Sequence, residues 1–183
     1  MRLFLAAGLA LALMGCASTD AGAQQQAQPA PPAHPCAAPE FRQMDFWVGV
    51  WDVRWEAMSG IPAGSGTNTI TREYANCVIQ EAFDGGPSTQ GLIGHSVSTY
   101  HTAMQRWRQT WVDNQGGYFA LVGGPEGDDF ILVSSRVSDN TPLQRMVFTD
   151  ITPDSLTWRW QRTPDAGQTW QDQWVIHYTR RGA

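Results

Sequence analysis

Glu81, Gln109 and Asp113 are the polar residues whose surroundings point most clearly to binding chemistry. Each lies at an alternate position of a stretch rich in aromatic and β-branched residues, the pattern of a strand with one buried face. Trp107 and Trp111 share the expected inward face with Gln109 and Asp113. Buried polar groups need hydrogen-bond partners, and aromatic walls with a few convergent polar groups are the usual lining of a small-molecule pocket. The predicted ligand-binding residues are Glu81, Tyr100, Trp107, Gln109, Trp111, Asp113 and Trp160.

The same polar residues allow two other interpretations. Glu81 and Gln109 can pair with each other, with a buried water or with the backbone inside a solidly packed domain that has no cavity. Glu81 could also act as a general acid or base if burial raised its pKa, but no second carboxylate is firmly placed beside it. We therefore expect binding rather than catalysis, with no catalytic residue and no cofactor.

Two further motifs fall short of a reactive site. The stretch GHSVS at 94–98 resembles a nucleophile elbow, but Ser98 replaces the last glycine and a β-like sequence follows where a helix is required. His95 and His101 share strand parity, yet six residues separate them by about 20 Å, too far for one metal ion. His177 is expected to face outward. No metal site is predicted.

Charge and composition exclude several functions. The formal net charge is −5, and all 12 basic residues are arginine, so the chain contains no lysine. This absence excludes Schiff-base chemistry on lysine and a Walker-type phosphate-binding lysine. The sequence has no basic stripe, so nucleic acid is not an expected partner.

The first residues are typical of a secretory signal peptide. A single arginine precedes an apolar run from Leu3 to Met14, which is too short to span a bilayer as a mature helix. Residues 13–16, LMGC, resemble the bacterial lipobox, which implies that Cys16 carries lipid and becomes the first mature residue. The alternative is simple cleavage after Ala23, which fits the small-x-small rule.

The chain divides into three parts on this interpretation. Residues 1–15 form the signal peptide, and residues 16–37 form a tether of Gln, Ala and Pro that cannot bury enough apolar surface to fold. Residues 38–183 form the folded domain. If Cys16 carries lipid, Cys36 and Cys77 remain, and in an oxidising compartment we expect a disulfide rather than a metal site, with two free thiols as the alternative.

The folded domain reads as all-β. Short strands alternate with turns rich in Gly, Pro, Asn and Asp, and no helical period lies between them, apart from one turn near 38–43. About ten strands in simple succession favour an antiparallel up-and-down barrel, because closure removes exposed edges; a sandwich is the alternative. The predicted strands are 46–56, 65–74, 76–83, 91–101, 105–113, 117–123, 128–137, 142–150, 155–162 and 169–180.

Strand parity predicts which side chains point inward. In the first strand the charged residues occupy even positions, so the odd positions should face the interior: Trp47, Gly49, Trp51, Val53 and Trp55. By the same argument the last strand should turn its even positions inward: Trp170, Asp172, Trp174, Ile176, Tyr178 and Arg180.

Gly49-x-Trp51 on the first strand, with Arg180 on the inner face of the last, resembles the calycin signature of lipocalins and their relatives. The resemblance implies that Trp51 plugs the closed end of a barrel, that Arg180 lies over its ring, and that Gly49 leaves space for the neighbouring backbone. The wider pattern resembles an uncharacterised family of bacterial lipocalin-like domains. Its further motifs here are Gly66-x-Asn68-x-Ile70, Cys77-x-x-x-Glu81, Gly94-x-Ser96, Trp107-x-Gln109-x-Trp111-Val112-Asp113 and Asp165-x-Gly167-x-Thr169-Trp170.

The last of these motifs reads as a structural hairpin turn. Asp165 should accept hydrogen bonds from turn amides, Gly167 should adopt a positive φ, and Trp170 should pack under the turn. We expect an envelope-located, periplasmic lipocalin-like domain, anchored to the outer membrane through lipid on Cys16, that binds a small amphipathic molecule. The alternative is a non-catalytic structural or protein-interaction lipoprotein with a solidly packed barrel.

Overall fold

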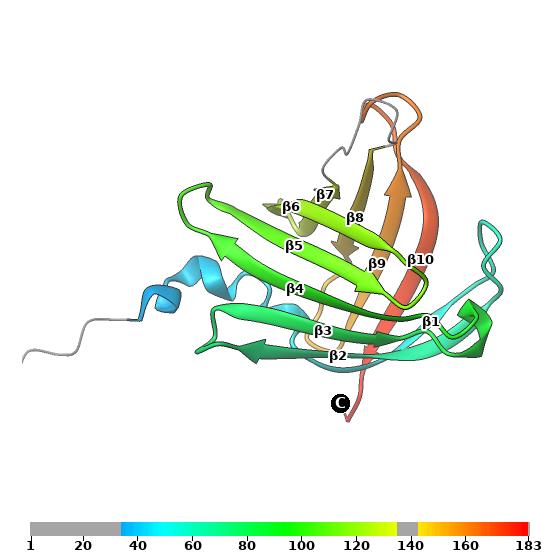
Figure 1. Cartoon of the computed structure of the whole chain (residues 1–183), viewed down its shortest axis with the longest axis horizontal. Helices are drawn as coiled ribbons and strands as arrows, with labels where there is room; N and C mark the ends of the chain where they lie inside the picture. The colour runs from blue at the N-terminus through cyan, green and yellow to red at the C-terminus, as the bar shows by residue number, and fades with distance from the viewer. Residues whose placement is uncertain (1–33, 135–142, 183) are drawn as a thin grey trace, which may run out of the picture. The chain divides into compact units, whose positions relative to one another are not determined.

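Alternating apolar and polar residues run through the segments that become strands in the computed structural model, which describes residues 34–134 and 143–182. In this part of the chain each strand pairs antiparallel with the next, and the last pairs with the first, which closes a ten-stranded barrel (Figure 1). The predicted up-and-down barrel is thereby confirmed. The strands are β1 (Gly49–Trp55), β2 (Gly64–Glu73), β3 (Val78–Asp84), β4 (Ile93–His101), β5 (Arg106–Asp113), β6 (Tyr118–Glu126), β7 (Asp129–Ser134), β8 (Gln144–Thr149), β9 (Ser155–Arg162) and β10 (Gln171–Arg180).

The predicted signal peptide, Cys16 and most of the predicted tether lie outside the described residues. Within the described ranges, no helix combines the length and the apolar character that crossing a membrane requires.

Short 3-10 turns precede the barrel and cover one of its ends. They are η1 (Pro35–Ala37), η2 (Pro39–Arg42) and η3 (Asp45–Trp47), and a fourth, η4 (Pro87–Thr89), lies between β3 and β4. Proline begins η1 and η2, where its fixed φ suits a helical start. Phe41, Met44 and Trp47 are buried, so these turns supply apolar side chains to the core. The first strand begins at Gly49 and not at residue 46, because Asp45–Trp47 form a 3-10 turn at the end of the barrel.

Burial along β1 follows the predicted parity. Trp51, Val53 and Trp55 are buried, whereas Asp52 and Arg54 on the opposite face are exposed. The interior of the barrel is correspondingly aromatic, and its buried members form one continuous core with the N-terminal turns.

The first residues of β10, near residue 172, depart from the predicted parity. The pairing of β10 with β9 shifts between Asp172 and Trp174, which is the mark of a bulge. The carboxylate of Asp172 accepts hydrogen bonds from Arg159 Nη1 at 2.7 Å and Gln161 Nε2 at 2.9 Å. These partners alternate with Trp158 and Trp160, so they lie on the outer face of β9. The prediction that Asp172 faces inward is wrong, because the extra residue reverses the alternation at that point.

The closed end of the barrel is fastened by Arg180. Its guanidinium carbon lies 4.1 Å from the centroid of the Trp51 ring. Nη1 donates to the carbonyl of Val48 at 2.7 Å, Nη2 to that of Phe46 at 3.0 Å, and Nε to that of Pro153 at 2.7 Å. One side chain thus joins the last strand to the segment before β1 and to the β8–β9 loop.

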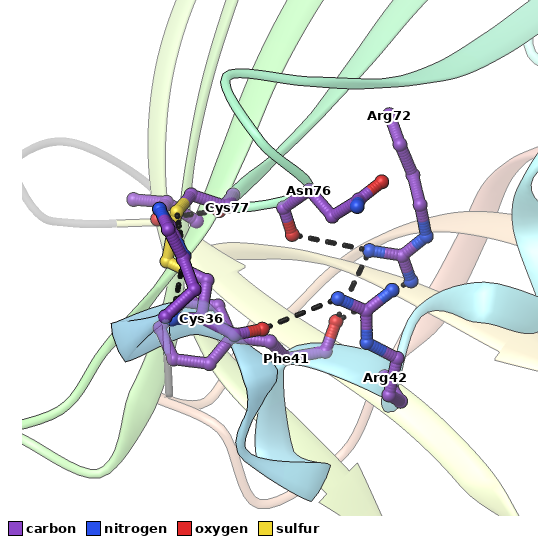
Figure 2. Close-up of a disulfide and its surroundings, with 8 residues drawn as sticks. Cys36, Phe41, Arg42, Arg72, Asn76 and Cys77 are labelled. Atoms are coloured by element: carbon purple, nitrogen blue, oxygen red, sulfur yellow. Dashed lines mark hydrogen bonds between the residues drawn. A yellow bond between two sulfur atoms is a disulfide. The ribbon is translucent and has the colours of Figure 1, made fainter. Parts of the chain in front are cut away.

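A disulfide joins Cys36 in η1 to Cys77 in the β2–β3 turn (Figure 2). Arginines reinforce the same contact: Arg42 donates to the carbonyl of Cys36 at 3.2 Å, and Arg72 donates to the carbonyl of Phe41 at 3.3 Å. The N-terminal turns are therefore held against the end of the barrel where β2 ends and β3 begins.

The β9–β10 turn is organised around Asp165. Its Oδ1 accepts from the amide of Thr169 at 2.7 Å and from Thr163 Oγ1 at 2.8 Å, and Gly167 has a φ of +101°. Hydrogen bonds from Thr169 lower the pKa of Asp165 to about 2, so this carboxylate stays ionised. Trp170 lies at the end of the turn. The guanidinium carbon of Arg145 lies 4.2 Å from the centroid of the Trp170 ring.

Candidate ligand-binding site

A cavity of about 140 Å³ lies at the end of the barrel opposite the disulfide. Trp111 and Asp113 reach it from the last residues of β5, Trp160 from the last residues of β9, and Trp174 from the first residues of β10. Engineered cavities of about 150 Å³ hold a single benzene ring, whereas pockets for drug-sized ligands begin at about 300 Å³. The cavity therefore suits a molecule built on one small ring.

Aromatic rings make up most of the cavity wall. Trp174 lies nearly perpendicular to Trp158, at 89°, and to Phe83, at 90°, with ring centroids 6.2 Å and 5.9 Å away. Neighbouring rings that are perpendicular line the cavity on adjoining sides, and we call the aromatic lining residues the aromatic box. The lining tryptophans and Phe119 are half-buried, whereas Phe83 and Tyr178 are buried. The aromatic lining residues are Phe83, Trp111, Phe119, Trp158, Trp160, Trp174 and Tyr178.

Glu81 is the polar group at the base of this box. It points inward from β3 and is 6% exposed. Its Oε1 accepts from Asn68 Nδ2 at 2.7 Å, and its Oε2 accepts from Ser96 Oγ at 2.6 Å. The two donors come from the neighbouring strands β2 and β4, so the sheet itself fixes the carboxyl group.

Burial raises the pKa of Glu81 to about 7, although the hydrogen bonds from Ser96 and Asn68 oppose the shift. The carboxyl group is therefore close to half-ionised at neutral pH. Asn68 Nδ2 also donates to the hydroxyl of Tyr178 at 3.0 Å. Burial, and to a smaller extent the nearby Glu81, raise the pKa of Tyr178 above its ordinary value, so this phenol stays neutral.

Asp113 supplies a second carboxyl group, near the mouth. Its Oδ2 accepts from Trp111 Nε1 at 2.9 Å, and its Oδ1 accepts from the amides of Gly117 at 2.7 Å and Gln115 at 2.9 Å. Partial burial works against ionisation, but these hydrogen bonds outweigh it and hold the pKa of Asp113 below its usual range. Asp113 is thus a fixed negative charge at neutral pH.

We expect the pH dependence of stability to differ between the wild-type protein and the Glu81→Gln variant. In the folded protein the raised pKa keeps Glu81 protonated up to about pH 7, whereas the unfolded chain ionises near 4.5. The folded state binds more protons within this window, so the free energy of unfolding falls as the pH rises through it. The full loss from this group is about 3 kcal/mol, and a glutamine cannot show it.

Urea denaturation of both proteins between pH 4.5 and 8 measures this difference. The wild-type value minus the Glu81→Gln value should decrease by about 3 kcal/mol over the range. Glu56→Gln, which removes an exposed carboxylate after β1, should leave the wild-type profile unchanged. A wild-type-to-variant difference that is flat with pH would rule out the raised pKa.

The structure brings four of the seven predicted ligand residues to the cavity: Glu81, Trp111, Asp113 and Trp160. Gln109 is buried below it and donates to Ser98 Oγ at 3.0 Å. Tyr100 and Trp107 pair with each other at the opposite end of the β4–β5 hairpin. There they border a separate hollow of about 290 Å³, and Trp107 Nε1 donates to Gln43 Oε1 at 3.0 Å.

Several cavity residues were not among the predicted ones. Strand parity placed Trp158 and Trp174 on the inward face, but they were not included among the predicted ligand-binding residues. Asn68 and Ser96 lie on inward positions of Gly66-x-Asn68-x-Ile70 and Gly94-x-Ser96, but their role as donors to Glu81 depends on which strands are neighbours.

The histidines of the described chain lie away from the cavity lining. His34 approaches the two cysteines with metal-like spacing, and its Nδ1 lies 3.9 Å from Cys77 Sγ. Both sulfur atoms are used in the disulfide, which leaves one imidazole as the available ligand.

A closed ten-stranded antiparallel barrel with a buried aromatic cluster is compatible with a lipocalin-like binding fold. No family model matches the chain, and no curated protein matches it.

Proposed function

We propose that this domain is a lipocalin-like binding protein that holds a small amphipathic molecule, of about one substituted ring, in the cavity above Glu81. The observation that carries the proposal is an aromatic box of about 140 Å³ with a buried carboxyl group at its base. Such a combination of apolar walls and a few polar groups is the usual composition of a small-molecule site.

Hydrogen-bonding capacity left over inside the cavity supports the proposal. Each oxygen of Glu81 accepts one side-chain hydrogen bond from the protein, and a carboxylate oxygen has room for a second. A ligand whose N–H or O–H group lies against Glu81 would donate to an acceptor position that the protein leaves free.

The cavity also bears on the alternative of a solidly packed barrel. In that interpretation Glu81 and Gln109 pair with each other, with a buried water or with the backbone inside a filled core. Gln109 bonds to Ser98 and Glu81 bonds to Asn68 and Ser96, so both have partners within the protein, but open space adjoins Glu81. It is this open space that favours ligand binding over a purely structural role.

We place the protein in the bacterial envelope, anchored to the outer membrane through lipid on Cys16, on the sequence of its first 23 residues. Mass spectrometry of protein purified from its own envelope tests this placement. The mature chain should begin at Cys16 with attached acyl chains, and a mature chain beginning after Ala23 would contradict it.

Blocking the cavity mouth tests the proposed function. Leu92 is a half-buried lining residue, so Leu92→Trp adds bulk where the ligand would lie. We expect the wild-type protein to bind benzyl alcohol with a dissociation constant of about 0.1–1 mM, in keeping with eight non-hydrogen atoms. The variant should bind at least roughly tenfold more weakly, a difference of about 1.4 kcal/mol.

Isothermal calorimetry measures both affinities. Val97→Trp adds the same indole to the exposed outer face of β4, the strand that follows Leu92, and should bind as the wild type does. Equal affinity of the Leu92→Trp and Val97→Trp proteins would show that binding occurs elsewhere.

A further inference from the structure

We propose that the natural ligand of the cavity is a small organic cation, an amine whose ammonium group lies against Glu81 and whose apolar body fills the aromatic box. This inference rests on the proposed function, and it specifies the chemical class of the ligand.

The charged residues that the structure describes in the cavity lining are of one sign. Glu81 and Asp113 both line it, and the described lining residues include no arginine and no histidine. Lysine is absent from the whole chain. An anionic ligand such as a fatty acid would meet two carboxyl groups without a compensating cation, which is unfavourable in a partly desolvated site.

The aromatic walls add a second preference for positive charge. The face of an indole ring carries negative electrostatic potential, and cages of aromatic rings are the usual receptors for organic ammonium groups. Trp158 and Trp174 meet at 89°, and Trp158 and Trp160 are parallel within 7° with centroids 6.2 Å apart. A cation within this box would contact several ring faces.

Glu81 has no counter-charge among the residues that the structure describes. The groups that face it are Asn68 from β2, Ser96 from β4 and Tyr178 from β10, and all three are neutral. Among the described lining residues, the other charged group is Asp113 from β5, which repels a second negative charge. An ammonium group would supply the missing cation and stabilise the ionised form of Glu81.

This pairing makes the affinity depend on pH. An ammonium ligand binds best to ionised Glu81, whose pKa is raised to about 7 by burial. The ionised fraction therefore grows about tenfold between pH 6 and pH 8, and amine affinity should grow with it. A neutral ligand of the same shape should show little change.

Three matched ligands test the inference by calorimetry at pH 6 and pH 8: benzylamine, benzyl alcohol and benzoate. At pH 8 benzylamine should bind wild-type protein at least roughly tenfold more tightly than benzyl alcohol, and benzoate should bind least. In Glu81→Gln the preference should shrink to within roughly threefold and lose its pH dependence, because the counter-charge is gone. Glu56→Gln, with one surface carboxylate removed, should keep both.

The outcomes separate this inference from the proposed function. If wild-type protein binds benzylamine and benzyl alcohol equally at both pH values, the cation assignment is overturned while the cavity remains a binding site. A preference for the amine that persists in Glu81→Gln overturns the role given to Glu81. If none of the three ligands binds, the proposed function itself fails.

Discussion

Replacing Arg180 by alanine is expected to lower the free energy of unfolding by about 5 kcal/mol. The side chain donates three hydrogen bonds to carbonyl groups of Val48, Phe46 and Pro153, and it covers the ring of Trp51. Hydrogen bonds from a charged donor contribute about 1.5–3 kcal/mol each, and a desolvated cation–π contact about 1–2 kcal/mol, with some loss of additivity. A change of this size is a large share of the stability of an ordinary domain.

The neighbouring arginine provides a matched control for the Arg180 prediction. Arg181 pairs with Asp52, and both side chains are exposed, so Arg181→Ala should cost less than about 1 kcal/mol. Arg180→Lys keeps the charge but cannot reach three carbonyl groups, and it should recover less than half of the loss. Urea denaturation of the three variants measures these values. Equal stability of Arg180→Ala and Arg181→Ala would refute the fastening role.

Gly49 offers an independent approach to the same contact. A Cβ atom at this position would overlap Nη1 of Arg180, and the φ of Gly49 is +144°. Gly49→Ala should therefore destabilise the barrel in the same direction, because a side chain there displaces the guanidinium and strains the backbone.

Removing the disulfide should cost about 4 kcal/mol. Cys36 and Cys77 are 41 residues apart, and the chain-entropy estimate for a closed loop of that length gives about this value. The double variant Cys36→Ser, Cys77→Ser should therefore unfold at a lower urea concentration, because its unfolded state is no longer restricted.

Wild-type protein treated with a dithiol reductant is the control for the disulfide prediction. It should unfold at the same urea concentration as the double variant, since both lack the cross-link. Under native conditions the double variant should bind benzyl alcohol as the wild type does, because the disulfide and the cavity lie at opposite ends of the barrel. Unchanged stability on reduction would mean that the turns η1 to η3 do not depend on the cross-link.

The two ends of the barrel thus differ in their structural roles. Arg180, the disulfide and the N-terminal turns hold one end closed, and the aromatic box with Glu81 occupies the other.

Much of the fold could be predicted from alternation alone. Charged residues at even positions of β1 fixed the inward face of Trp51, Val53 and Trp55, and turn residues at regular intervals indicated successive hairpins. The relation of Trp51 to Arg180 came from a resemblance and has the expected form in the structure, with the cation over the ring.

The composition of the site was harder to predict, because parity gives the face of a strand and not the height along the barrel. Tyr100, Trp107 and Gln109 face inward, yet they lie at or toward the closed end, away from the cavity. The predicted inward orientation of Asp172 was wrong because a β-bulge gives no clear signal in the alternation of the local sequence. The hydrogen bond from Asn68 to Tyr178 joins residues 110 positions apart, which only the closed pairing order brings together.

A crystal structure of the protein with benzylamine would test the central claim most directly. The account predicts the ammonium nitrogen within about 3 Å of a carboxylate oxygen of Glu81, with the ring inside the cavity against the aromatic lining residues. Electron density for benzylamine on the outer face of the barrel, with the box beside Glu81 holding only water, would contradict it.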